Sequence, residues 1–327
     1  MKACLHNKYG PPEVVQLIDV TKPVPGDEEI LIKIYATTVT AVDAIFRKGD
    51  QFFARMATGP FRPKISTLGS EFSGVVEAVG KNVKSFKAGD AVLGDSSTGF
   101  GTHAEYLCIA EGEPIIAKPA QLSFEEAAAV PYGALTALPF LRDNAKIRKG
   151  QNVLINGASG TIGSYAVLFA KYFGAKVTGV CSSANIELVR ALGAEEVIDY
   201  TKADFTEKKE TYDVIFDTVG KSSFSRCKSA LKTNGIYLTT VVGFPILLQM
   251  LWTSMAGTKK AIVAFTGLRP AEEKLKDLQF VSELIEGGRL KPLVDKRFSL
   301  EEIAGAHAYV EQGHKKGSVA ITVHVEK

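Results

Sequence analysis

The chain has 327 residues, of which 46% are hydrophobic and 23% are charged. At about 150 residues per domain, this length predicts two domains that each bury an ordinary hydrophobic core, which excludes a disulfide-stapled miniprotein and wholesale disorder. Lys plus Arg is 39 and Asp plus Glu is 36, so the net charge of +3 is too weak to indicate a nucleic-acid partner.

The cysteines and the apolar stretches indicate a cellular location. Cys4, Cys108, Cys181 and Cys227 stand far apart and form no C-x-x-C pair, which favours a reducing compartment. The first twelve residues lack the apolar centre of a secretory signal. The most apolar stretch, residues 246–257, is shorter than the roughly 20 residues of a membrane span. We therefore expect a cytoplasmic protein with no membrane partner, in which this stretch is buried or interfacial.

The first third of the chain has the pattern of a turn-rich antiparallel β domain. Short β-rich runs at residues 29–35, 74–79 and 91–93 alternate with Gly and Pro clusters such as residues 23–27. The last sixth adds an amphipathic helix over residues 272–286 and a closing strand over residues 318–325.

From Gln151 onward, strands alternate with helices, which predicts a parallel sheet covered by helices. Asn185 is expected to cap one of these helices, and Gly193 to end it in a left-handed conformation. Six strands would complete a doubly wound sheet. They are expected at residues 152–156, 176–181, 196–200, 212–219, 235–242 and 261–265.

A glycine-containing turn follows the first of these strands. Gly157-Ala158-Ser159-Gly160-Thr161-Ile162-Gly163 leads from an apolar strand into a helix. Gly160 would let the backbone approach a pyrophosphate, and Gly163 would let the helix pack closely on the strand. Free N–H groups at the start of the helix would hold the phosphates. The alternative is a purely structural turn, but the strand-helix-strand context favours dinucleotide binding. The expected coenzyme contacts are Ser159, Gly160, Thr161, Ile162 and Gly163.

The second strand of this unit ends at Cys181-Ser182-Ser183. An Asp or Glu at this place would bind the adenosine ribose hydroxyls of NAD. Two hydroxyls stand here instead, and they suit a 2′-phosphate. We therefore expect NADPH, with NADH as the alternative coenzyme, and coenzyme contacts from Ser182, Ser183 and Asn185. In the alternative interpretation these three residues serve only the loop and the helix cap.

At this point the sequence resembles the medium-chain dehydrogenase/reductase superfamily and, within it, the zinc-independent quinone oxidoreductase branch that includes zeta-crystallin. The resemblance covers nearly the whole chain. It rests on segments that follow one another in a fixed order, among them Gly69-Ser70-Glu71-Phe72-Ser73-Gly74, the glycine turn, Asp217-Thr218-Val219-Gly220 and residues 313–322.

The resemblance implies an α/β fold in which a Rossmann domain with a doubly wound parallel sheet is inserted into a GroES-like β domain. The GroES-like catalytic and substrate domain would comprise residues 1–117 and 267–327. The Rossmann dinucleotide-binding domain would comprise residues 118–266. A homodimer is the expected assembly, since similar proteins commonly form one.

The same resemblance implies that no metal is bound. Zinc-dependent relatives hold catalytic zinc with Cys and His at the positions that match Thr40, Ser70 and Tyr132. None of these three residues is a good zinc ligand at neutral pH. The five histidines, His6, His103, His307, His314 and His324, are scattered without ligand spacing, and we expect ordinary surface or core roles for them.

Candidate catalytic groups are carried over from the family at Tyr132, Thr40 and Asp43, with Thr136 beside the nicotinamide. The Tyr132 hydroxyl could donate to a developing oxyanion or merely fill space. Asp43 is interpreted first as a helix cap and only second as an acid or base. The family's further coenzyme contacts match Tyr200, Val219, Gly220, Val242, Gly243 and Lys316.

Without a zinc ion to polarise a plain ketone, conjugated acceptors suit the site better. The leading hypothesis is a zinc-independent, NADPH-dependent oxidoreductase that transfers hydride to a small apolar quinone, enone or related carbonyl compound. One alternative is a catalytically silent NADPH-binding structural or regulatory protein, and another is an NAD(P)-dependent alcohol dehydrogenase. Residues 246–252 could line an apolar substrate channel, form a dimer contact or lie in the core.

Overall fold

The computed structural model describes residues 1–64, 66–96, 99–255 and 257–325. Contacts divide the chain into two compact units, the first built from Met1–Tyr132 with Gly267–Lys327 and the second from Gly133–Thr266. The first unit therefore unites the two ends of the chain, and the second consists of one continuous segment. The helix α4 (Pro131–Pro139) carries the chain from one unit into the other.

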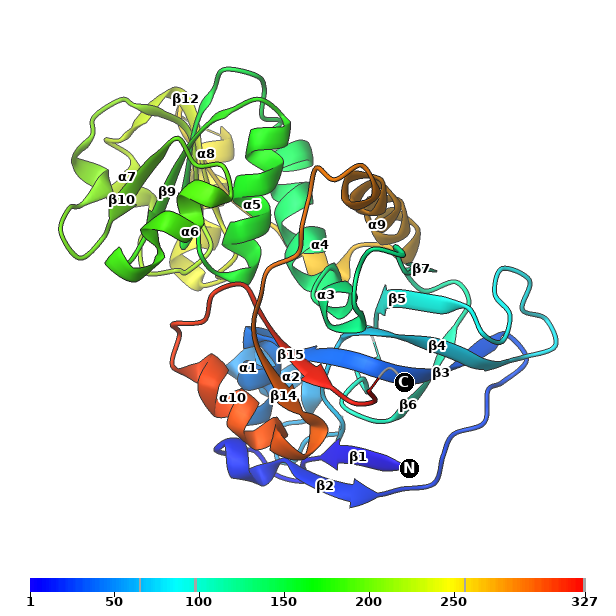
Figure 1. Cartoon of the computed structure of the whole chain (residues 1–327). Coiled ribbons are helices and arrows are strands. Elements are labelled where there is room, and N and C mark those ends of the chain that lie inside the picture. Colours follow the sequence, from blue (N-terminus) through cyan, green and yellow to red (C-terminus); the bar gives the residue numbers. More distant parts are fainter. Residues whose placement is uncertain (65, 97–98, 256, 326–327) are drawn as a thin grey trace. The chain divides into compact units, whose positions relative to one another are not determined.

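The first unit is built on an antiparallel sheet (Figure 1) with the strand order β14-β15-β3-β4-β5-β7, in which β6 also pairs with β3. The exception is β14, which runs parallel to β15. A separate antiparallel pair joins β1 to β2. The strands of this unit are β1 (Lys2–Leu5), β2 (Gln16–Asp19), β3 (Glu29–Val39), β4 (Glu71–Val79), β5 (Ala91–Asp95), β6 (Tyr106–Ala110), β7 (Ile115–Ala117), β14 (Val294–Ser299) and β15 (Ser318–Thr322).

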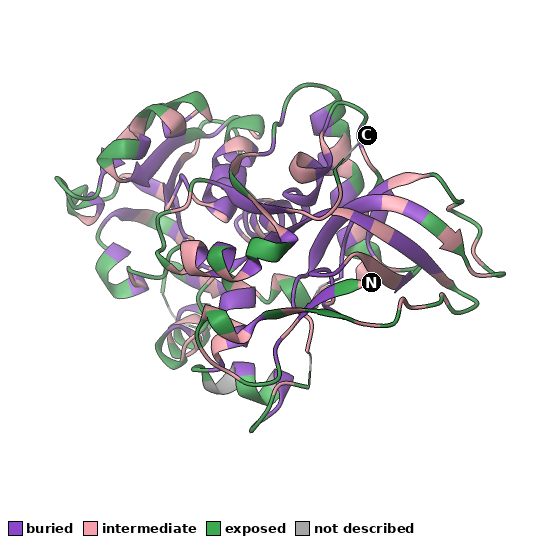
Figure 2. Ribbon diagram, turned by 60° about the horizontal axis from the view of Figure 1, so that its bottom comes forward, coloured by how far each residue is buried: buried purple, intermediate pink, exposed green. Residues whose placement is uncertain are grey.

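Alternation along β3 creates the core of this unit. Ile30, Ile32 and Ile34 point to one face and are fully buried against Phe72 and Val92. Burial of each such side chain stabilises the fold by about 1.5–3 kcal/mol relative to exposure. Figure 2 shows buried residues concentrated along the strands and exposed residues on the loops.

The first unit also contains the helices α1 (Ala41–Lys48), α2 (Phe52–Thr58), α3 (Phe124–Ala128), α9 (Ala271–Glu286) and α10 (Ile303–Glu311). A capping box between Ser123 and Glu126 starts α3. Phe124 stacks on Tyr35 with ring centroids 4.4 Å apart, and Ala128 packs in the same cluster as Ala36. These contacts attach α3 to the first unit, whose first segment extends to Tyr132.

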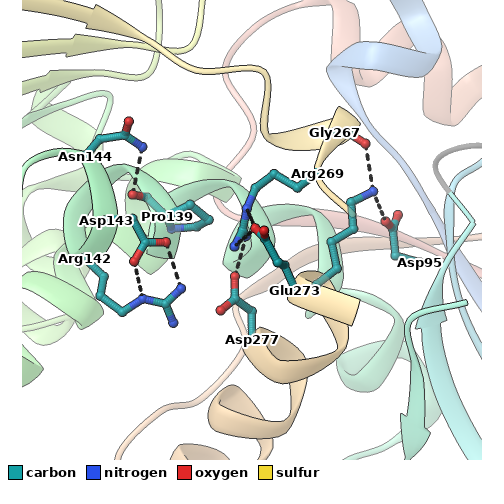
Figure 3. Close-up of polar contacts among 10 residues, drawn as sticks. Asp95, Pro139, Arg142, Asp143, Asn144, Gly267, Arg269, Glu273 and Asp277 are labelled. Carbon is teal, nitrogen blue, oxygen red and sulfur yellow. Dashed lines mark hydrogen bonds and ion pairs between the residues drawn. The ribbon is translucent and has the colours of Figure 1, made fainter. Parts of the chain in front are cut away.

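A buried ion pair joins α9, in the later segment of the first unit, to β5, in its earlier segment. The Lys274 ammonium lies 3.2 Å from Asp95 Oδ2 and donates a hydrogen bond of 2.8 Å to the Gly267 carbonyl (Figure 3). Both charged side chains are almost inaccessible to water. One turn along α9, Asp277 accepts a hydrogen bond from Arg269. Breaking a buried pair leaves an uncompensated charge, so these contacts fix α9 on the first unit.

The second unit contains a parallel sheet with the strand order β10-β9-β8-β11-β12-β13. All neighbouring pairs in this order are parallel. Its strands are β8 (Asn152–Asn156), β9 (Lys176–Cys181), β10 (Glu196–Asp199), β11 (Tyr212–Asp217), β12 (Leu231–Thr239) and β13 (Lys260–Val263), and its helices include α5 (Thr161–Tyr172), α6 (Ile186–Ala191), α7 (Phe224–Cys227) and α8 (Phe244–Met255). This order confirms the predicted doubly wound sheet, in which the order of strand addition reverses between β8 and β11.

The strands of this sheet are apolar because helices cover them. Leu154, Val180 and Ile215, on β8, β9 and β11, are fully buried in one core cluster. A half-buried antiparallel strand would instead alternate apolar and polar residues. The continuous apolar runs of the sequence therefore predicted the right kind of sheet.

Two local expectations differ from the structure. Asn185 precedes α6, but its side chain makes no capping hydrogen bond. The apolar stretch from residue 246 lies in α8, where Ile246 is buried but Leu248, Leu251 and Trp252 are 51%, 60% and 57% exposed. Core burial is thus wrong for most of that helix. In the described residues, no helix combines the length and the hydrophobicity of a membrane span.

Candidate functional site

The turn between β8 and α5 lies at the switch point of the parallel sheet. Gly157 has a φ of +82°, a backbone conformation that glycine adopts without strain. The Gly157 and Ala158 N–H groups donate to the Val180 carbonyl on β9. Gly160 then provides the extended N-cap of the twelve-residue helix α5. The first turn of a helix has N–H groups without intrahelical partners, so this end of α5 suits an anion.

The two later glycines of this turn have different physical roles. A Cβ on Gly163 would lie 2.0 Å from the Gly157 carbonyl oxygen, so close helix–strand packing requires glycine there. A Cβ on Gly160 would meet nothing nearer than that same oxygen, at 3.4 Å. Packing within the protein therefore does not explain Gly160. A residue without a side chain at this place is what the close approach of a diphosphate to the backbone requires.

Asn185 supplies an independent indication that this turn can bind a ligand. Its amide nitrogen donates to Ser159 Oγ at 3.1 Å and to Ser182 Oγ at 3.3 Å. Its Oδ1 atom is buried without a hydrogen-bond partner in the described part of the chain. An unsatisfied buried acceptor costs about 1–3 kcal/mol, and a hydroxyl or amide donor on a bound molecule would remove that cost. The residues around the turn thus fit a dinucleotide coenzyme.

A carboxylate that sequence reasoning missed stands beside the two serines. Asp199 ends β10 and is paired in register with Cys181 at the end of β9. The Ser183 hydroxyl donates to Asp199 Oδ2. Hydrogen bonds from Ser183 and then Thr201 lower the pKa of Asp199 to about 2. The expectation that no carboxylate lies near this strand end is therefore wrong, because strand pairing brings one from 16 residues further along the chain.

The loop after β11 is organised by Asp217, another residue absent from the sequence-based site. Its fully buried carboxylate accepts hydrogen bonds from the Val219 and Gly220 N–H groups, each at 3.0 Å. It also accepts from Tyr237 Oη at 3.0 Å and from Asn156 Nδ2 at 2.9 Å. Asp217 thereby fixes the expected contacts Val219 and Gly220 at the carboxyl ends of β8 and β11. The position of Asp217 at the end of an apolar strand was the signal in the sequence that could have identified this residue.

The remaining expected coenzyme contacts lie further apart. Tyr200 directly follows β10 and is 55% exposed. Val242 and Gly243 lie between β12 and α8. Thr136 is half-buried in α4. Lys316 belongs to the first unit, where its N–H donates to Asp295.

Thr40 and Asp43 form the capping box of α1. The Asp43 N–H donates to Thr40 Oγ1, and Asp43 Oδ2 accepts from the Thr40 N–H at 2.7 Å. The other carboxylate oxygen, Oδ1, accepts from the Gly69 N–H at 2.9 Å. Both side chains are buried. The hydrogen bonds of Asp43 thus agree with the structural interpretation of this residue.

Glu71 connects this region to Tyr132. Its buried carboxyl accepts hydrogen bonds from the Thr38 hydroxyl and from the Tyr132 N–H, the latter at 2.7 Å. Burial raises the pKa of Glu71 to about 8. Burial together with the nearby Asp43 and Glu71 also raises the pKa of the Tyr132 phenol. The Tyr132 hydroxyl is therefore protonated at neutral pH and can act as a hydrogen-bond donor but not as a base.

The positions that hold zinc in zinc-dependent relatives do not fit a zinc ion. Thr40 is used in the capping box, and neither it nor Ser70 or Tyr132 offers a thiolate or an imidazole. Within the ranges that the structure describes, no three or more His, Cys, Asp or Glu side chains are grouped to hold a metal ion. The absence of a bound metal stays a prediction.

Two family models match the chain. An alcohol dehydrogenase GroES-like domain covers residues 26–120, and a model described as zinc-binding dehydrogenase covers residues 192–321. Human quinone oxidoreductase is 30% identical over 324 residues, or 96% of this chain and 94% of that protein. The 2-methylene-furan-3-one reductase of Solanum lycopersicum is 33% identical over 335 residues, or 98% of this chain and 79% of that protein.

This chain belongs to the medium-chain dehydrogenase/reductase superfamily. Within the superfamily it is a member of the quinone oxidoreductase branch, as the sequence resemblance indicated. A crystal structure of Escherichia coli quinone oxidoreductase complexed with NADPH has a TM-score of 0.85 and 26% identity, and the match covers 99% of this chain and 100% of that one. This similarity confirms the predicted combination of a GroES-like and a Rossmann fold.

We predict that Glu71 makes the stability of the protein depend on pH. The pKa of Glu71 is about 8 in the folded chain, whereas the ordinary pKa of a glutamate, which applies to the unfolded chain, is 4.5. The folded state therefore binds the Glu71 proton more tightly than the unfolded chain does. The Glu71 contribution is fully present below about pH 4.5 and is lost as the pH rises to about 8. Glu71→Gln should flatten this decline in thermal unfolding curves recorded from pH 5 to pH 8.5.

The control is Glu77→Gln, which removes a partly exposed carboxylate from the same strand, β4. Its unfolding temperatures should decline with pH as steeply as those of the unmodified chain. Equal slopes for Glu71→Gln and the unmodified chain would show that Glu71 does not carry a raised pKa.

A second prediction separates packing from ligand binding in the glycine turn. Gly163→Ala places a Cβ 2.0 Å from a backbone oxygen and should lower the unfolding temperature by several degrees. Gly160→Ala meets no such obstacle and should unfold within about 2 °C of the unmodified chain, yet bind NADPH at least tenfold more weakly in calorimetry. Unchanged NADPH affinity in Gly160→Ala would mean that the diphosphate does not approach this residue.

Proposed function

We propose that this protein is a zinc-independent, NAD(P)H-dependent oxidoreductase that reduces quinones, enones or related apolar carbonyl compounds. The observation that carries the proposal is the β8–α5 turn, where a Cβ on Gly160 would come no nearer than 3.4 Å to another atom, and where Ser159 accepts a hydrogen bond from Asn185, whose Oδ1 atom is buried without a partner among the described residues. The names of the human and tomato relatives, a quinone oxidoreductase and a furanone reductase, support the same acceptor classes.

The proposal assigns the coenzyme to the second unit. A reduced nicotinamide coenzyme supplies a hydride when it is bound. The N–H groups at the start of α5 would bind its diphosphate. The contacts proposed for it on the second unit are Thr136, Ser159, Gly160, Thr161, Ile162, Gly163, Ser182, Ser183, Asn185, Tyr200, Val219, Gly220, Val242 and Gly243, and Lys316 is proposed from the first unit.

The groups that serve the acceptor are assigned to the first unit. Tyr132 would donate its phenolic hydrogen to the oxygen on which negative charge develops, and its raised pKa keeps that hydrogen in place. In a quinone or an enone the charge is delocalised, so one neutral donor is a suitable partner where no metal ion polarises the carbonyl. Glu71 and Asp43 would hold the backbone at Tyr132 and Gly69.

Purified protein should oxidise NADPH or NADH in the presence of a quinone or an enal, with no stoichiometric zinc in elemental analysis. Tyr132→Phe should lower kcat by about 10-fold or more while leaving the coenzyme Kd within twofold, because it removes one hydrogen bond made to the developing oxyanion. Absorbance at 340 nm and calorimetry measure the two quantities.

The outcomes separate the competing functions. Tight coenzyme binding without turnover on any acceptor would favour a structural or regulatory role. Oxidation of simple alcohols together with stoichiometric zinc would favour an alcohol dehydrogenase. Unchanged kcat in Tyr132→Phe would remove Tyr132 from the catalytic groups without affecting the proposed function.

We also propose that the protein is a cytoplasmic homodimer. The support is an exposed apolar face on α8, where Phe244, Leu248, Leu251, Trp252 and Met255 recur at helical spacing and are each at least half exposed. A soluble chain seldom leaves such a face uncovered. The adjoining strand β13 is at the edge of the parallel sheet, so α8 and this edge would meet a second copy.

Sedimentation should give twice the 35.2 kDa mass of one chain. Leu251→Asp should shift the protein to the monomer, because a second copy would have to bury the new charge. Val24→Asp is the control, since Val24 is 85% exposed in a loop of the first unit, and this variant should remain dimeric. A dimeric Leu251→Asp variant would contradict the proposed interface.

A further inference from the structure

A small polar group lies at the carboxyl ends of β9 and β10, where Asp199 is the common partner of its neighbours. Asp199 Oδ2 accepts a hydrogen bond from the Ser183 hydroxyl and lies 3.6 Å from the Lys202 ammonium. Asp199 Oδ1 accepts from the Thr201 hydroxyl at 2.7 Å and from the Thr201 N–H at 3.0 Å. Both carboxylate oxygens are therefore engaged by neighbouring donors.

This polar group lies where dinucleotide-binding sheets bind the adenosine ribose. The strand that follows the glycine turn and its helix ends where the adenosine ribose is bound. Here that strand is β9, and Ser182 and Ser183 come directly after it. The carboxylate arrives from the next strand, since Asp199 and Cys181 are partners in the parallel register. A 2′-hydroxyl or a 2′-phosphate bound at this place would therefore lie near both serine hydroxyls and a carboxylate.

The hydrogen-bond directions decide what this group offers to a ligand. The Ser183 hydroxyl has one hydrogen, and that hydrogen already points to Asp199. Ser183 consequently presents lone pairs to a ligand, which suit the hydrogen of a 2′-hydroxyl but not the oxygens of a phosphate. Lys202, whose side chain is 72% exposed, has its charge balanced by the same carboxylate.

We propose that Asp199 sets the coenzyme preference of this protein by holding Ser183 and Lys202, the two donors that would otherwise bind a 2′-phosphate. The inference rests on the proposed coenzyme binding and adds to it the residue that discriminates between NADH and NADPH. The carboxylate opposes a 2′-phosphate by like charge. The pKa of Asp199, about 2, keeps its carboxylate ionised throughout the pH range in which the coenzymes are stable.

The inference changes the expectation drawn from the two serines. With Asp199 in place, the protein should discriminate less than tenfold between NADPH and NADH. Replacement of Asp199 by Asn keeps the side-chain shape and an acceptor oxygen but removes the charge. The Ser183 hydroxyl can then turn to a phosphate oxygen, and the Lys202 ammonium loses its partner. Both changes strengthen NADPH binding and leave NADH binding nearly constant.

The test is calorimetric titration of the full chain with NADPH and with NADH, applied to the unmodified protein, Asp199→Asn, Ser183→Ala and the double variant. The measured quantity is the NADH Kd divided by the NADPH Kd. Asp199→Asn should raise this ratio at least tenfold. Ser183→Ala alone should change it less than threefold, but in the Asp199→Asn background it should lower the ratio at least threefold.

Glu196→Gln is the matched control, because it removes one negative charge from the opposite end of the same strand, where Glu196 pairs with Lys208. Its ratio should stay within twofold of the unmodified chain. A rise of less than tenfold in Asp199→Asn, or an equal rise in Glu196→Gln, overturns the inference. If Asp199→Asn does not fold, Ser183→Ala decides, since a threefold or larger loss of NADPH affinity would show that Ser183 already serves the phosphate. Failure of the unmodified chain to bind either coenzyme would instead overturn the proposed function.

Discussion

The close approach of α5 to the end of β8 is the constraint on which the proposed site depends. The helix can approach the strand this closely only because Gly163 has no side chain to collide with the Gly157 carbonyl oxygen. That approach aims the N-terminus of α5 at the carboxyl edge of the parallel sheet, where the ends of β9 and β11 also lie. Asn185, Asp199 and Asp217 then become neighbours of one strand-end region through strand pairing and side-chain hydrogen bonds. A binding region is thereby made from residues that a single local motif does not contain.

Two kinds of polar side chain stand at this edge, and they differ in how completely they are satisfied. Asp217 accepts hydrogen bonds from main chain and side chains and acts as a fixed anchor of its loop. Asn185 is satisfied on its nitrogen only, and its oxygen remains without a partner among the described residues. The anchor can be understood from the protein alone, whereas the unsatisfied oxygen is understood more easily with a ligand. The same distinction separates Gly163 from Gly160.

Local patterns in the sequence predicted the kind of sheet in each unit, and the family resemblance supplied the insertion of the Rossmann domain into the GroES-like domain. Continuous apolar runs predicted a parallel sheet, and Gly193, with a φ of +111°, follows α6 as expected. The site was only partly predictable, because its polar contacts depend on pairing between segments far apart in the sequence. The end of β9 has no carboxylate of its own, so Asp199 was invisible until the register placed β10 beside it. Asn185 had the residue type and position of a cap, but its amide nitrogen donates to Ser159 and Ser182, and its side chain makes no capping hydrogen bond. The exposure of Leu251 and Trp252 could not be inferred from their hydrophobicity.

The discontinuous first unit has a consequence for biosynthesis. Its strand β15, from the last ten residues of the chain, lies between β14 and β3, and the buried pair of Lys274 with Asp95 again joins late residues to early ones. The whole second unit is therefore synthesised before β15, the strand that pairs with one edge of β3. The parallel sheet can fold while this edge of β3 is still unpaired. Open strand edges promote aggregation. During synthesis, the edge of β3 that later pairs with β15 is therefore an open strand edge in the amino-terminal third.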